Sequence, residues 1–282
     1  MHLYKTTEGI ILSHNNEHFH FRGDWDELIN RSNLFEFLLQ ITTSIEKISD
    51  DKLNNLLNTS LLAPIGTQEV WAAGVTYLRS RDARMEEAKN AGGGDFYQKV
   101  YDAQRPELFF KALPHRVSAH KRDVYIRKDS SWNVPEPELT LYINSKGEIQ
   151  GYTIGNDMSS RSIEGENPLY LPQAKVYDKS AALGPCLCVM NEPILKETNI
   201  QLIIKRNAQN VFVGSIQVSK IKRSLTELAE YLFRESTFPV GCFLMTGTGI
   251  VPPDDFTLQQ GDEVSITIDG IGTLTNKVSI RR

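Results

Sequence analysis

The chain has 282 residues, a length that suits one catalytic domain with a small accessory domain. Hydrophobic residues make up 40% of it and charged residues 23%, which is ordinary globular composition, and the formal net charge is −4. This acidic balance, with no block of basic residues, argues against nucleic acid or an anionic membrane as a partner and leaves small molecules as the expected partners.

Cysteine use and the N-terminal residues indicate the compartment. The sequence has three cysteines, which cannot all pair within one chain, and Cys186 and Cys188 stand two apart in an expected strand. We therefore expect buried free thiols in a reducing cytoplasm. Residues 1–20 carry polar groups throughout, so neither a signal peptide nor a membrane span is expected.

Residues 1–65 are expected to form a small N-terminal α+β domain. Residues 1–21 alternate loosely between apolar and polar side chains and indicate two short strands joined at Asn15. Asn33–Ile48 has apolar residues at helical spacing and predicts an amphipathic helix. A Pro-Ile-Gly sequence at 64–66 ends this unit, and residues 66–282 are expected to form the catalytic domain.

A strand and a charged helix open the second unit. Glu69–Val75 predicts a strand, and Thr76–Lys89 predicts a helix that leads to three glycines at 92–94. Such glycines permit either a plain helix stop or a hinge. The segment is therefore either a mobile lid over a site or a solvated surface helix, and within it we assign substrate contacts to Ser80 and Arg81.

Glu107 stands just before the strand-like Leu108-Phe109-Phe110 and has no evident helical partner. One interpretation is a solvated charge where a strand begins. The other is a carboxylate near the substrate that moves a proton. The neighbouring residues do not decide between the two.

The stretch Pro135–Ile143 alternates polar residues with proline, leucine and isoleucine, which predicts a strand with Glu136 and Glu138 on one face. The turn signal at Asn144–Gly147 predicts a hairpin that returns the chain and brings Asp157 beside the two glutamates. Close carboxylates repel each other, and a hard cation with oxygen ligands, such as Mg²⁺, would remove that repulsion. The competing interpretation is that the two glutamates form the solvated face of an edge strand.

The C-terminal third consists mainly of expected strands. Ser224 and Glu227 form a capping-box pattern that opens a helix with a structural role. Thr246–Pro252 holds a Thr-Gly-Thr-Gly turn, in which glycine lets the backbone approach a ligand and Thr248 offers a hydroxyl to a substrate. Many short strands and few helices predict an α+β fold, a mainly-β sandwich or roll rather than regular βαβ units.

Several motifs occur in one order: Glu-x-Glu, then Asp157 in an Asp-x-Ser-x-Arg turn, then Lys175 ahead of a Gly-Pro pair. This pattern resembles the fumarylacetoacetate hydrolase superfamily from residue 70 to the C-terminus. The resemblance implies a fumarylacetoacetate hydrolase-like sandwich roll as the catalytic domain. It also implies metal ligands at Glu136, Glu138 and Asp157, and a catalytic lysine at Lys175.

The superfamily's carbon–carbon hydrolases carry a His-x-x-Glu pair after a Gly-x-x-Tyr motif, and this pair activates the attacking water. Gly74–Tyr77 resembles that motif, but the aligned positions hold Ser80 and Ala83, so a hydrolytic water would lack its base. The segment instead resembles the dehydratase branch, which acts on 2-keto-3-deoxy-D-arabinonate. That resemblance implies a catalytic role for Glu107 as a proton carrier.

The implied reaction is the metal-dependent dehydration of a 2-keto-3-deoxypentonate to 2,5-dioxopentanoate. The cation would polarise the 2-oxo acid and acidify its C3 protons, a base would remove one, and hydroxide would leave from C4. Lys175 is the base if its pKa is lowered, or a charged donor that orients the substrate, and a Schiff base at this lysine is a further alternative. Mg²⁺ is the expected cofactor, with Mn²⁺ or Ca²⁺ as alternatives.

Two other functions stay open. One is an acylpyruvate-type hydrolase or an oxaloacetate decarboxylase on the same scaffold, and release of pyruvate from such compounds would favour it. The other is a non-enzymatic binding protein that has kept the fold, and inertness towards 2-oxo acids would favour that. The family resemblance also implies a homo-oligomer, either a dimer or a tetramer.

Overall fold

The computed structural model describes residues 1–87 and 94–281. Strands of the larger sheet span His2–Thr6 (β1), Gly9–His14 (β2), Glu17–Phe21 (β3), Glu46–Ile48 (β4), Glu69–Gly74 (β5), Glu107–Ala112 (β6), Val117–Ser118 (β7), Pro137–Ile143 (β10), Ile149–Asp157 (β11), Ala181–Cys188 (β13) and Cys242–Met245 (β16). Strands of the smaller sheet span Asp123–Ile126 (β8), Asn199–Arg206 (β14), Gln209–Gln217 (β15), Glu263–Ile268 (β17) and Gly272–Ile280 (β18). A separate short pair joins Asn133–Val134 (β9) to Ser159–Ser160 (β12).

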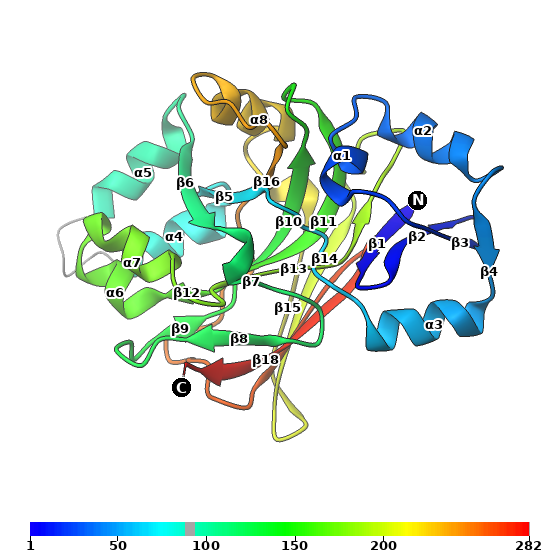
Figure 1. Ribbon diagram of the computed structural model, residues 1–282. Coiled ribbons are helices and arrows are strands. Elements are labelled where there is room, and N and C mark those ends of the chain that lie inside the picture. The colour runs from blue at the N-terminus through cyan, green and yellow to red at the C-terminus, as the bar shows by residue number, and fades with distance from the viewer. Residues whose placement is uncertain (88–93, 282) are drawn as a thin grey trace.

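The helices lie outside these sheets (Figure 1). They span Trp25–Ile29 (α1), Leu34–Ile41 (α2), Asp50–Thr59 (α3), Leu78–Glu87 (α4), Gly94–Asp102 (α5), Arg161–Glu166 (α6), Leu171–Lys175 (α7) and Leu225–Phe233 (α8). Short 3₁₀ helices cover Pro114–Arg116, Pro168–Tyr170 and Val218–Lys220. Figure 1 shows α4, α5, α6 and α7 gathered on one side of the molecule, and α1, α2 and α3 on the opposite side.

Two packed sheets enclose the main core of the described chain. The larger sheet runs β4-β3-β2-β1-β13-β11-β10-β16-β5-β6, with β7 beside β13, and the smaller runs β15-β14-β17-β18-β8. Leu139 and Leu141 of β10 share one apolar cluster with Leu202 of β14 and Ile266 of β17, so the sheets bury one another's inner faces. This architecture confirms the predicted α+β, mainly-β fold.

The N-terminal strands continue the larger sheet. Leu3 of β1 pairs with Leu187 of β13, so residues 1–65 share a sheet with the rest of the chain. The division after residue 65 stays a prediction. Three strands, not the expected two, lie within residues 2–21, and the turn at Asn15 joins the second to the third.

The helix predicted over Asn33–Ile48 ends early, because α2 stops at Ile41 and β4 follows. The hydroxyls of Thr42, Thr43 and Ser44 each donate to a backbone carbonyl three residues earlier, at 2.7, 2.9 and 3.1 Å. Such side-chain bonds compete with continued helix. The charged helix expected over Thr76–Lys89 is confirmed as α4, whereas the hinge proposed at 92–94 lies mainly outside the described residues.

The other expected elements are present. The hairpin of β10 and β11, the strands β14, β15, β17 and β18, and helix α8 all occur, and the Ser224 hydroxyl accepts the capping hydrogen bond from Glu227 N at 3.1 Å. The three cysteines are free and buried. In the residues that the structure describes, no helix is both long and apolar enough to cross a membrane.

Candidate active site

The hairpin of β10 and β11 gathers three carboxylates. Glu136 N donates to Asp157 O at 3.2 Å and Asp157 N donates to Glu136 O at 2.9 Å, so these two residues face each other across the ladder. Glu138 lies opposite Gly155, which has no side chain to occupy the same face. One carboxylate oxygen from each of Glu136, Glu138 and Asp157 lies within 4.8 Å of the others. The predicted convergence of the three residues is therefore present.

The solvated edge strand is the wrong interpretation for the two glutamates. Strand β10 lies between β11 and β16, inside the larger sheet. Glu136 is 5% exposed and Glu138 and Asp157 are 1% exposed. Buried carboxylates need hydrogen-bond donors or cations, so their surroundings define the site.

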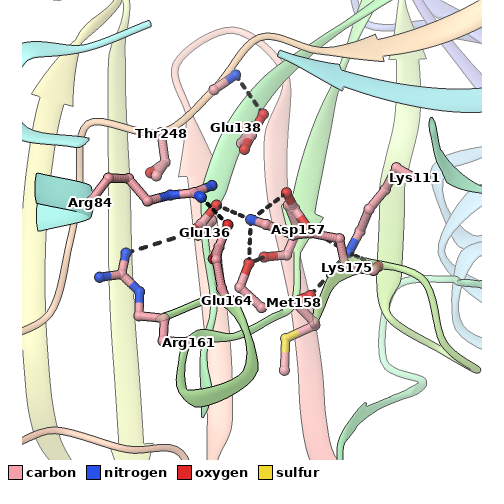
Figure 2. Close-up of polar contacts among 12 residues, drawn as sticks. Arg84, Lys111, Glu136, Glu138, Asp157, Met158, Arg161, Glu164, Lys175 and Thr248 are labelled. Carbon is pink, nitrogen blue, oxygen red and sulfur yellow. Dashed lines mark hydrogen bonds and ion pairs between the residues drawn. The ribbon is translucent and has the colours of Figure 1, made fainter. Parts of the chain in front are cut away.

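Lys175, at the C-terminal end of α7, contacts two of the three carboxylates (Figure 2). Its Nζ donates to Glu136 Oε2 at 2.8 Å, to Asp157 Oδ2 at 3.0 Å and to Ser159 Oγ at 2.6 Å. Burial acts to lower its pKa, but attraction to Asp157 and Glu136 outweighs burial, and the pKa lies above its ordinary value. The hydrogen bonds to two carboxylates fit the charged-donor alternative for Lys175, and its role as a base stays a prediction.

A second buried lysine, to which we assigned no role from the sequence, lies on the other side of Asp157. Lys111 Nζ is 2.5 Å from Asp157 Oδ1 and donates to the backbone carbonyls of Met158 at 3.0 Å and Lys175 at 2.6 Å (Figure 2). Burial lowers the pKa of Lys111 despite its pairing with Asp157. Its signal in the sequence is a charge that directly follows the apolar residues Leu108-Phe109-Phe110 within β6, because charged side chains are rarely buried unless they are paired.

Glu136 and Glu138 differ in their electrostatic surroundings. Burial acts to raise the pKa of Glu136, but Lys175 and Arg161 outweigh burial and hold the pKa at about 2. Arg161 Nη2 lies 3.4 Å from Glu136 Oε1. Glu138 accepts a hydrogen bond from Gly247 N at 2.6 Å, yet burial and repulsion by Asp157 and Glu136 raise its pKa well above the ordinary value. Three carboxylates with oxygen-only donors, one of them repelled by its neighbours, are the donor set that a hard divalent cation would stabilise.

A small cavity borders these carboxylates and Lys175. Besides the charged residues already described, its wall includes Gly74, Ser80, Arg84, Phe109, Gly247 and Thr248. Of the expected substrate contacts, Ser80 and Thr248 therefore reach the cavity. Their hydroxyls donate to backbone carbonyls, Ser80 to Tyr77 O at 2.8 Å and Thr248 to Ile250 O at 3.3 Å.

Arg84, one helical turn beyond Ser80 on α4, reaches the cavity where Arg81 does not. The Arg81 guanidinium donates to Asp82 through Nε at 2.8 Å and lies over the ring of Tyr101, and it is absent from the cavity wall. Arg84 forms a buried ion pair with Glu164 of α6 (Figure 2). Sequence reasoning missed Arg84 and Glu164 because 80 positions separate them along the chain.

Glu107 lies at the start of β6, directly opposite Gly74 of β5. A Cβ atom at Gly74 would stand 2.0 Å from Glu107 Oε2, so this carboxylate fills the space that the glycine leaves. Gly74 belongs to the cavity wall and Glu107 lies behind it, outside that wall. Glu107 Oε2 is buried and has no hydrogen-bond partner among the described residues. Burial raises the pKa of Glu107, with Arg84 opposing that shift. One carboxylate oxygen of Glu107 is thus buried, while the residue as a whole is partly exposed, so its role as a proton carrier stays a prediction.

Comparison with known proteins places this geometry in a family. Residues 70–279 match the family described as fumarylacetoacetate (FAA) hydrolase C-terminal. The chain is 43% identical over 254 residues to a probable 2-keto-3-deoxyxylonate dehydratase of Haloferax volcanii, with 89% of this chain and 84% of the relative covered. It is 41% identical over 250 residues to the 2-dehydro-3-deoxy-D-arabinonate dehydratase of Saccharolobus solfataricus, with 88% and 84% covered.

A solved structure shows the same fold. It is that of a 2-keto-3-deoxy-D-arabinonate dehydratase complexed with magnesium and 2,5-dioxopentanoate, and it matches with a TM-score of 0.84 and 34% identity over 100% of both chains. The sequence match alone covers well over half of the present chain. The chain belongs to the fumarylacetoacetate hydrolase C-terminal family.

Proposed function

We propose that the protein is a magnesium-dependent dehydratase that converts a 2-keto-3-deoxypentonate to 2,5-dioxopentanoate. The observation that carries the proposal is the buried cluster of Glu136, Glu138 and Asp157 beside Lys175, in a chain that is 41–43% identical to two dehydratases of such acids. The missing histidine after Tyr77 supports elimination over hydrolysis, because Ser80 and Ala83 offer no base for an attacking water.

Glu136, Glu138 and Asp157 would hold the cation. Mg²⁺ is proposed because the solved relative contains it, and Mn²⁺ or Ca²⁺ suits the same oxygen donors. When bound, the ion supplies Lewis-acid polarisation of the substrate's 2-oxo group, which acidifies the C3 protons. Lys175, held as an ammonium between Glu136 and Asp157, fixes both carboxylates and offers its charge to the substrate.

Glu107 is proposed to move the proton. Its raised pKa suits a group that accepts a proton from C3 and returns it to the hydroxide that leaves C4. The C3–H and C4–O bonds break, a C3–C4 double bond forms, and water departs. Loss of a proton from C5 and gain of one at C3 move the double bond to C4–C5. The enol so formed gains a proton at C4 and loses its hydroxyl proton, which gives the aldehyde of 2,5-dioxopentanoate.

Substrate hydroxyls are proposed to contact Ser80 and Thr248, which line the cavity. We assign the guanidinium contact to Arg84 in place of Arg81, because Arg84 belongs to the wall of the cavity. We also propose that the enzyme is a homo-oligomer, a dimer or a tetramer, that works in the cytoplasm. Its three buried free thiols support a reducing compartment.

Incubation with synthetic 2-keto-3-deoxypentonates and Mg²⁺, with detection of the aldehyde product, tests the reaction. Dialysis against a strong chelator should abolish turnover, and Mg²⁺ should restore it. Glu136→Gln should lose metal-dependent turnover and weaken Mn²⁺ binding in a titration while the fold is kept. Glu166→Gln, at an exposed position of α6, is the matched control and should behave as the wild type.

Three results would contradict the proposal. Turnover that survives complete removal of the metal would exclude a metal-dependent site. A borohydride-trapped substrate adduct on Lys175 would indicate Schiff-base chemistry instead. Release of pyruvate from acylpyruvates or oxaloacetate, with no dehydration of deoxypentonates, would select the hydrolase or decarboxylase alternative.

A further inference from the structure

We propose that β15 is the edge through which two copies of this chain pair, antiparallel and across a two-fold axis, so that their smaller sheets become continuous. Among the described strands, β15 lies at one edge of the smaller sheet, opposite the β8 edge, and is hydrogen-bonded to β14 only. Figure 1 shows the β14–β15 hairpin projecting beyond the body of the molecule. The proposal rests on the proposed assembly into oligomers and is independent of the reaction.

Two other edge strands in the described residues, β4 and β8, carry features that prevent edge-to-edge pairing. Strand β4 has three residues, two of them the charged Glu46 and Lys47. Strand β8 has four residues and begins with Asp123. Short length and charge are known ways of blocking a free edge. These two edges are therefore protected in the single chain.

Strand β15 lacks that protection. It has nine residues, Gln-Asn-Val-Phe-Val-Gly-Ser-Ile-Gln, with no charge and no proline. Val211 is 41% exposed and Val213 is 54% exposed, and Val213 lies beside the partly buried Ile203 of β14. A long, neutral and partly apolar edge is a template for another strand, because its outward N–H and C=O groups have no ladder partner.

The inner face of β15 is anchored, which keeps the edge in one shape. Phe212 and Ile216 pack against the main apolar cluster. A Cβ atom at Gly214 would stand 2.7 Å from Ile250, and one at Gly249 would stand 2.4 Å from Ile216, so the strand also fits closely on the turn after β16. Such a preformed edge loses little conformational entropy on pairing.

A second copy is the occupant that the strand's chemistry favours. A two-fold axis places the strand against a second copy of itself, so a charge close to the axis would lie near its own copy, and β15 carries no charge. Residues opposite each other in antiparallel strands project to the same side, so Val213 would meet Val213, Ser215 or Gln217 of the second copy, all of them neutral. A bulge beside Lys205 leaves residues 212–217 as the regular stretch available for this pairing.

Val213→Lys tests the proposal, because it places two ammonium groups at the paired edge while the position is solvent-exposed in one chain. The readout is the mass of the full-length protein at micromolar concentration, by light scattering after gel filtration, with circular dichroism to verify the fold. The variant should show half the wild-type mass. Ser215→Lys, at a second exposed position of the strand, should do the same and serves if the first variant does not fold.

Two matched controls exchange exposed leucines elsewhere for lysine. Leu195→Lys and Leu169→Lys alter side chains that are 67% and 83% exposed, and both variants should keep the wild-type mass. A folded Val213→Lys variant of unchanged mass overturns the proposal, as does a monomeric wild type. Halved mass in Leu169→Lys alone would place the interface at the turn before α7 and also overturn it. Dehydratase turnover is measured separately, so failure of the reaction leaves this result interpretable.

Discussion

Replacement of Lys111 by methionine tests whether this lysine holds the carboxylate cluster together. Methionine keeps most of the side-chain volume but removes the ammonium that lies 2.5 Å from Asp157 Oδ1. The change also takes a hydrogen-bond donor from the carbonyls of Met158 and Lys175. Lys111 is completely buried, so water cannot replace the lost contacts without rearrangement.

The expected cost follows from these contacts. Removal of one partner of a buried ion pair costs about 3–5 kcal/mol, because the remaining charge loses a buried counter-charge. Asp157 would keep its contact with Lys175 at 3.0 Å, which places the expected cost at the lower end of that range. At about 2.1 cal/mol/K per residue, a chain of 282 residues has an unfolding entropy of about 0.6 kcal/mol/K. The melting temperature of Lys111→Met should therefore fall by about 5 °C.

Differential scanning calorimetry at neutral pH and low metal measures this loss. Lys128→Met, at an exposed position just after β8, provides the control and should melt with the wild type. Retention of the wild-type melting temperature in Lys111→Met would refute the reasoning. It would mean that the contacts of Lys111 with Asp157 and the two carbonyls contribute no net stability.

Three further predictions address the site and the fold. Gly74→Ala forces Glu107 away from its position, so kcat should fall by about 10² or more while the protein stays folded. Gly23→Ala is the control, because a Cβ atom there meets no atom within 4 Å, and it should leave kcat unchanged. Burial raises the pKa of Glu107 above the ordinary value of 4.5, so the folded state binds its proton more tightly than the unfolded state, and stability should fall as the pH rises above 4.5. Urea titrations at several pH values above 4.5 should show that the free energy of unfolding of Glu107→Gln rises relative to that of the wild type as the pH increases. A difference between the two proteins that does not change with pH would contradict the raised pKa. Ser224→Ala removes the N-cap of α8 and should cost about 1 kcal/mol in the same assay, with no change in metal binding.

The carboxylate cluster could be predicted from the sequence because its geometry is local. Period-two alternation around Glu136 and Glu138 gives the strand, and the turn at Asn144–Gly147 sets the register that returns Asp157 to them. The burial of these side chains could not be predicted in this way. It depends on β16, about 100 residues later in the chain, pairing with the other side of β10.

The charges around the cluster escaped prediction for a related reason. Lys111 and Arg84 acquire their roles from Asp157 and Glu164, which are far away in sequence, and no spacing rule connects them. In the N-terminal region, apolar residues continue at helical spacing past Ile41, but the side-chain hydroxyls that follow Ile41 bond to backbone carbonyls and the helix ends there. Local patterns thus identified the elements, and long-range contacts decided which charges face one another.

Two of the three carboxylates, Glu136 and Asp157, are paired with the cationic side chains of Lys111, Lys175 and Arg161. Small metal-binding domains often unfold without their ion because nothing else neutralises the ligands. Here the protein supplies its own counter-charges, so folding does not have to wait for the ion. Newly made chains should therefore reach their final shape in metal-poor surroundings and become active on later exposure to the ion, without a second round of folding.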